Sequence, residues 1–142
     1  MKSKRRKARE LAIQVLYSWQ ISKKIVLFET EKYVIEQNKK YSLDKIYFHK
    51  IVTGVIKNIF YIDKIIKKNI SKKKNRLDYI EQAILRLASY EIIKRLDIPY
   101  KVIINEGIEL AKIYGSNKSH KFINSILDKI ITNKNNIKIK NF

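Results

Sequence analysis

Residues 3–20 read SKRRKARELAIQVLYSWQ, and this stretch decides the fold class. Its apolar residues recur at intervals of three and four, which places them on one face of a helix. They are Ala8, Leu11, Ala12, Val15, Leu16 and Trp19. Ser3 precedes the pattern and is a typical N-cap residue. The stretch therefore predicts an amphipathic helix with a buried apolar face and a strongly basic N-terminal end.

Helical spacing continues along the chain, whereas turn signals are rare, with 3 Gly and 1 Pro. We predict further helices over about 28–39, over 42–70 with a break between Gly54 and Asn58, from Asp78 or a neighbour to about Arg95, from Pro99 to Tyr114, and from about 119 onward. Gly115 suits the left-handed position that ends a helix, and Ser116 or Ser119 can cap the last one. The predicted fold class is all-α, with about seven helices.

The length of 142 residues fits one compact domain. We expect this domain to cover residues 1–132. The remaining residues, 133–142, alternate Lys, Asn and Ile without a helical stripe, so we expect a flexible basic tail there.

Composition excludes several classes of protein. There is no Cys, so a disulfide framework and a thiolate metal site are ruled out. We find neither a signal peptide nor a run of about 20 apolar residues, and expect a cytoplasmic protein with no membrane association. The net charge of +19 suits a polyanion partner. However, Ile, Lys and Asn make up 64 of the 142 residues, so a solvated lysine surface explains the charge equally well.

Signatures of catalysis are absent from the sequence. We find no phosphate-binding glycine loop, no His pair at metal spacing and no nucleophile elbow. His49 and His120 stand in lysine-rich surroundings without a nearby acid to orient them. We therefore expect a binding protein that is not an enzyme and that uses no cofactor and no metal.

The strongest local feature is a cluster of six cations before the first acid, Glu10. The cluster consists of Lys2, Lys4, Arg5, Arg6, Lys7 and Arg9. It holds three of the six arginines of the chain, although the background bias supplies lysine. Arginine binds phosphate in a planar, bidentate geometry, so the cluster predicts contact with RNA or DNA. Tyr17 lies off the apolar stripe and is a candidate for base stacking, with simple packing as the equal alternative; Phe122 is weighed in the same way.

Four ordered segments resemble the NusB family. They are residues 5–20, with RRKARE leading to LYSWQ; 80–91, IEQAILRLASYE; 97–112, with DIPYKV followed by INEGIELAK; and 119–129, SHKFINSILDK. Only the middle, from about Lys23 to Asn75, is poorly matched. The resemblance implies an all-helical fold of two packed bundles.

For this family the resemblance further implies a transcription antitermination factor. Such a factor pairs with NusE, a small-subunit ribosomal protein, and binds the boxA element of nascent, single-stranded RNA. The pair joins NusA and NusG on RNA polymerase, suppresses premature termination and supports ribosomal RNA synthesis. Carried over to this chain, the residues along the RNA are Lys2, Arg5, Arg6, Lys7, Arg9, Tyr17, Lys121 and Phe122, and Glu81 faces NusE. Six of the 13 acids fall between Asp78 and Glu109, which would suit a basic partner.

Three positions depart from the family pattern. Gly107 stands where relatives often have Ala, Ser125 where Gly is common, and Lys118 where an acid is common. Two other functions stay open: an RNA cytosine methyltransferase, since some carry a NusB-like domain, and a scaffold that has lost RNA specificity. The missing glycine-rich cofactor domain counts against the first. The exact RNA target and the oligomeric state do not follow from the sequence.

Overall fold

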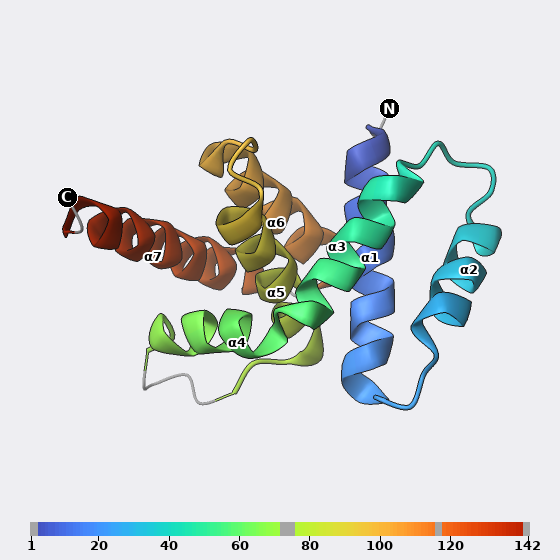
Figure 1. Cartoon of the computed structure of the whole chain (residues 1–142), viewed down its shortest axis with the longest axis horizontal. Coiled ribbons are helices and arrows are strands. Elements are labelled where there is room, and N and C mark those ends of the chain that lie inside the picture. Colours follow the sequence, from blue (N-terminus) through green and yellow to red (C-terminus); the bar gives the residue numbers. More distant parts are fainter. Residues whose placement is uncertain (1–2, 72–75, 116–117, 141–142) are drawn as a thin grey trace.

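The computed structural model describes residues 3–71, 76–115 and 118–140, with side chains as far as residue 135, and these residues form seven helices and no strand (Figure 1). The helices are α1 (Lys4–Ile21), α2 (Leu27–Gln37), α3 (Lys45–Lys57), α4 (Ile59–Lys68), α5 (Tyr79–Lys94), α6 (Tyr100–Tyr114) and α7 (Ser119–Lys140). The predicted all-α class and the number of helices are confirmed.

Side-chain caps start three of these helices. The Ser3 hydroxyl accepts from the Arg6 amide at 3.0 Å, and the Asp44 carboxylate accepts from the Tyr47 amide at 3.0 Å. At α5, Asp78 accepts from the backbone of Glu81 while the Glu81 side chain accepts from the backbone of Asp78. This reciprocal capping box satisfies amides that have no partner inside the helix.

The helices form two groups, as predicted, and α5 joins them. In one group α1 packs against α2 and α3; in the other α5 packs against α4, α6 and α7. Figure 1 shows the first group on the right and the second on the left. Because α1 and α3 also pack on α5, the apolar face of α1 is fully buried from Ala8 to Leu16, while Trp19 at its end is half-buried.

The break between α3 and α4 falls at Asn58, within the predicted interval. Gly54, the first residue of that interval, lies inside α3. A Cβ at Gly54 would lie 2.4 Å from Cε2 of Tyr90, so this glycine permits close approach to α5. The Asn58 side chain donates to the Gly54 carbonyl at 2.7 Å and closes the end of α3.

Two expectations for the C-terminal part are corrected. Gly115 has φ −103° and ψ −173°, which is extended and not left-handed. Residues 133–140, expected outside the helices as a flexible tail, continue α7 to Lys140. Lys134 Nζ donates to the Ile92 carbonyl at 2.6 Å, so the extension starts in contact with α5. Ser116, one of the two predicted caps, and residues 141–142 lie outside the described residues.

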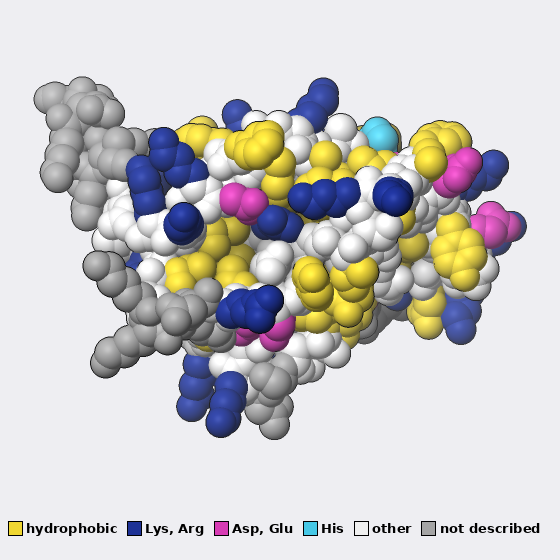
Figure 2. Space-filling view, turned by 90° about the horizontal axis from the view of Figure 1, so that it is seen from below, with side chains coloured by type: hydrophobic (Ala, Val, Ile, Leu, Met, Phe, Trp, Pro, Cys, Tyr) yellow, Lys and Arg dark blue, Asp and Glu magenta, His cyan; other side chains and the backbone are white. Residues whose placement is uncertain are grey.

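Basic side chains are spread widely over the surface. Figure 2 shows Lys and Arg across the whole face that it draws, with few acids between them. Over the described residues, no helix combines the length and the apolarity that crossing a membrane requires. Charge alone therefore does not mark a single binding site, and the site has to be found from individual side chains.

Candidate nucleic-acid interface

The outer face of α1 carries the first part of the site. Lys7, Gln14 and Tyr17 share this face, because they are seven and three residues apart. Gln14 and Tyr17 are exposed. Lys7 is half-buried, with Nζ 3.9 Å from the centroid of the Tyr41 ring and 3.6 Å from Glu10 Oε2. This face thus presents a cation at one end and an aromatic ring at the other.

Arg5 and Arg6 leave α1 on different sides, since neighbouring residues are about 100° apart around a helix. Arg5 is exposed, and its guanidinium lies 4.6 Å from the centroid of the Tyr47 ring. Arg6 is 33% exposed, and its Nε donates to the two carboxylate oxygens of Glu106 at 3.0 and 3.3 Å. Both guanidiniums reach solvent, and both are held by a partner on another helix.

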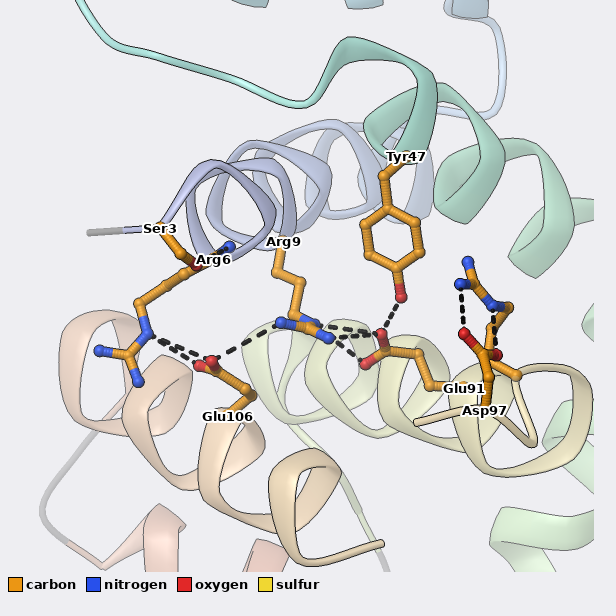
Figure 3. Close-up of polar contacts among 8 residues, drawn as sticks. Ser3, Arg6, Arg9, Tyr47, Glu91, Asp97 and Glu106 are labelled. Atoms are coloured by element: carbon orange, nitrogen blue, oxygen red, sulfur yellow. Dashed lines mark hydrogen bonds and ion pairs between the residues drawn. The ribbon is translucent and has the colours of Figure 1, made fainter. Parts of the chain in front are cut away.

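Arg9 is not on the surface, which does not fit the predicted RNA contact. The residue is 3% exposed and lies between α1, α5 and α6. Its Nε and Nη2 donate to the Glu91 carboxylate at 3.0–3.1 Å, and Nη1 lies 3.6 Å from Glu106 Oε1 (Figure 3). A cation paired in this way has no free face for a phosphate.

The Arg9–Glu91 pair also includes the Tyr47 hydroxyl, which donates to Glu91 Oε2. Burial by itself lowers the pKa of Arg9, but the charge and hydrogen bonds of Glu91 outweigh burial and raise it. Burial and the same carboxylate raise the pKa of Tyr47. The guanidinium therefore stays charged and the phenol neutral, and together they compensate a carboxylate that is 1% exposed.

A second, exposed ion pair lies in the turn between α5 and α6. Arg95 donates from Nε and Nη2 to the Asp97 carboxylate at 3.0 and 2.8 Å. The hydrogen bond from Arg95 lowers the pKa of Asp97 to about 2, and the charge of Arg5 contributes in the same direction. Asp97 is thus ionised at neutral pH and offsets part of the positive charge near the start of α1.

The other end of the site lies at the start of α5, a helix that packs against both α1 and α7. The rings of Tyr17 and Tyr79 make an edge contact, with centroids 6.2 Å apart and planes at 85°. Two residues after Tyr79, the Glu81 carboxylate accepts from the Ser119 hydroxyl at 3.4 Å. The first turn of α7 is therefore close by, and it carries Lys121, which is exposed, and Phe122, which is half-buried against the core.

The structure thus places Tyr17 beside Tyr79 toward the C-terminal end of α1, while Arg5, Arg6 and Lys7 lie at the opposite end of that helix. Twelve residues separate Arg5 from Tyr17, or about 18 Å at the helical rise. A stacked strand at roughly 3.4 Å per nucleotide spans this distance with about five nucleotides. Lys2 lies outside the described residues.

Glu81, predicted to face a protein partner, is 4% exposed and belongs to the α5 capping box. The structure also gives less support to the expectation that the acids between Asp78 and Glu109 meet a basic partner. Glu91 and Glu106 bind arginines of α1, Asp97 binds Arg95, and Glu109 lies 3.7 Å from Lys112. Most acids between residues 78 and 109 therefore neutralise cations of the chain itself.

Three residues make contacts that the sequence did not reveal: Glu106, Tyr79 and His49. Glu106 and Tyr79 are far from α1 in sequence, and no local pattern connects them to it. His49, thought to lack an acid, has its Nδ1 2.8 Å from Oε2 of Glu31 on α2. For Arg9 a signal was present: it lies three residues before Ala12 and seven before Leu16, both of which are fully buried.

An all-helical domain with an arginine-rich helix end and exposed aromatic rings has the features of a nucleic-acid-binding protein. Comparison with known proteins identifies the family within this class. The family model described as "NusB family" matches residues 6–132. The chain belongs to the NusB family.

Named relatives and solved structures agree with this assignment. The chain is 46% identical over 132 residues to the transcription antitermination protein NusB of Shewanella frigidimarina, covering 93% of this chain and 98% of the relative. It is 48% identical to the NusB protein of Buchnera aphidicola subsp. Baizongia pistaciae, covering 91% of each. A T. maritima NusB structure matches with TM-score 0.81 at 32% identity, covering 93% of each chain. A crystal structure of antitermination factors NusB and NusE in complex with dsRNA matches with TM-score 0.81 and 32% identity over 93% of this chain and 98% of that chain.

Proposed function

We propose that the protein, a transcription antitermination factor of the NusB family, binds the boxA element of nascent RNA together with NusE. The observation that carries the RNA role is the position of Arg5, Arg6 and Lys7 at one end of α1 and of the exposed Tyr17 ring toward the other. Cations at one end suit phosphates, and an aromatic ring at the other suits an unpaired base.

The proposed contact set combines exposed side chains of the site with positions that the family resemblance implies. Arg5, Arg6 and Lys121 bind phosphates and Tyr17 stacks on a base; Lys2, Lys7 and Phe122 are further contacts that the family resemblance implies. Arg9 is left out, because its guanidinium is saturated by two carboxylates inside the fold. Its role is to hold α1 on α5 and α6.

The partner roles are proposed from the family. NusE binds a second surface, and the complex joins NusA and NusG on RNA polymerase in the cytoplasm and supports ribosomal RNA synthesis. We propose that Glu81 influences NusE binding by holding the start of α5 beside α7, since the carboxylate is buried. We propose no catalytic role for the chain.

The test is an RNA titration with and without NusE at two salt concentrations. A boxA-type RNA and a scrambled RNA of equal length are compared, each as a single strand and as a duplex, because one solved relative is bound to dsRNA. We expect NusE to sharpen the preference for boxA, and we expect that preference to survive at the higher salt. Non-specific phosphate binding weakens with salt for both RNAs alike.

A scaffold without RNA specificity is the second candidate, and the spread of lysines over the surface favours it (Figure 2). The two functions differ in their response to Arg5→Ala combined with Arg6→Ala. The RNA-binding function predicts loss of boxA preference, because planar arginine contacts are removed. A generic basic surface predicts a small, equal loss for both RNAs.

A further inference from the structure

We propose that Glu106 is a positioning residue for RNA binding: it fixes the Arg6 guanidinium so that its two terminal nitrogens face the nucleic acid. The proposal rests on the proposed function, since it explains how one residue of that RNA face is oriented. No sequence motif connects Glu106 on α6 with Arg6 on α1.

The geometry of the pair leaves one edge of the guanidinium open. Among the described residues, Arg6 hydrogen bonds to other side chains only through Nε, which donates to Glu106 Oε2 at 3.0 Å and Oε1 at 3.3 Å. In Figure 3 the two terminal nitrogens of Arg6 point away from Glu106. These nitrogens are two donors in a fixed fork, which is the arrangement that binds a phosphate in a bidentate manner.

Glu106 can hold Arg6 because it is itself held. Its side chain is only 12% exposed, and its Oε1 lies 3.6 Å from Nη1 of Arg9. Arg9 is fixed in turn by the buried carboxylate of Glu91. A chain of charges therefore runs from α5 through α1 and α6 to the surface, and Arg6 is its outermost member.

Orientation matters because a free arginine loses rotamer freedom when it binds. An arginine already fixed by a buried carboxylate has lost much of that freedom on folding, so less is lost on binding. The opposing effect is repulsion, since an acid near a phosphate weakens binding through its charge. The two effects predict opposite signs when Glu106 is changed, which makes the proposal testable.

The first variant is Glu106→Asp, which keeps the charge but shortens the side chain by about 1.5 Å. Positioning predicts that affinity for boxA-type RNA falls about three- to tenfold, because the carboxylate no longer reaches Nε. Repulsion alone predicts no change.

The second variant, Glu106→Gln, removes the charge but keeps an oxygen acceptor. Positioning predicts that its affinity for the RNA equals or exceeds that of Glu106→Asp and does not exceed that of the unchanged chain. Repulsion alone predicts tightening beyond the unchanged chain.

Two controls separate positioning from a loss of folding or a general charge effect. Glu109→Gln changes the charge one turn along the same helix, where the acid lies 3.7 Å from Lys112, and must not weaken binding. In an Arg6→Ala background, Glu106→Asp must lose its effect, because nothing remains to be positioned. Urea unfolding of each variant confirms that the titrated protein is folded.

A loss with Glu106→Asp that disappears in the Arg6→Ala background supports positioning. Tighter binding with Glu106→Gln, unchanged binding with Glu106→Asp, or a loss that persists without Arg6 overturns it while RNA binding itself stands. Absence of boxA preference in the unchanged protein with NusE removes the proposed function, and the inference falls with it.

Discussion

The burial of Arg9 predicts that its replacement damages the fold and spares the RNA face. In Arg9→Met the methionine fills part of the volume, but the Glu91 carboxylate stays buried with the Tyr47 hydroxyl as its remaining close donor. Removing one partner of a buried ion pair costs about 3–5 kcal/mol, because the remaining charge is uncompensated. At a urea m-value of about 2 kcal/mol/M, the unfolding midpoint falls by roughly 2 M.

Arg5→Met is the matched comparison, since it removes an exposed arginine from the same helix. The lost contact with the Tyr47 ring costs about 0.5–1 kcal/mol at such a site. Arg5→Met affects RNA binding more than stability. The loss of one phosphate contact makes the slope of log affinity against log salt shallower by about 0.7 for a single strand. Arg9→Met leaves that slope unchanged once affinity is expressed per folded molecule.

The measurements are urea unfolding followed by circular dichroism and RNA titration at several salt concentrations. The reasoning is refuted if Arg9→Met loses less than about 1 kcal/mol of unfolding free energy, given the cost of an unpaired buried charge. It is equally refuted if Arg9→Met lowers the salt slope as much as Arg5→Met does. The first result would mean that the buried pair contributes little to stability, and the second that Arg9 leaves Glu91 to bind RNA.

Four further substitutions test stability. Gly54→Ala should lower the free energy of unfolding by about 1–3 kcal/mol, because the added Cβ would meet the Tyr90 ring at 2.4 Å. Gly107→Ala should raise the free energy of unfolding by about 0.5 kcal/mol. Alanine has the higher helix propensity, and only the Leu127 methyl at 3.1 Å has to shift. Equal effects in urea titrations would contradict this. Ser89→Ala should raise it by about 1 kcal/mol, because the buried Ser89 hydroxyl has no hydrogen-bond partner among the described residues; a loss would show that the hydroxyl is satisfied. Asp97 has a folded pKa of about 2, below its ordinary 3.8, so its stabilisation is present above about pH 4 and is lost as the pH falls toward 2. The stability difference between the unchanged chain and Asp97→Asn should therefore shrink over that range, and a constant difference would show that the ion pair contributes nothing.

The local chemistry of the helices was largely predictable. The spacing of apolar residues in α1, the cap at Ser3 and the capping residue Asp78 act over a few residues, so the sequence contains their full cause. The extension of α7 to Lys140 was not predictable from a stripe. Once a helix is nucleated, each added residue gains a backbone hydrogen bond without needing a buried face.

In the candidate site, too, some features have local causes and others depend on residues far apart in the sequence. The sequence by itself determined the helical class, the family and the basic, arginine-rich start of α1, because periodicity, motif order and residue type are local properties. Tertiary structure alone decided which of those cations are available. Adjacent residues point about 100° apart, so Arg5 faces Tyr47, Arg6 reaches Glu106 at the surface and Arg9 meets Glu91 in the interior. These partners lie about 40 to 100 residues away along the chain, and only the packing of α3, α5 and α6 against α1 brings them together.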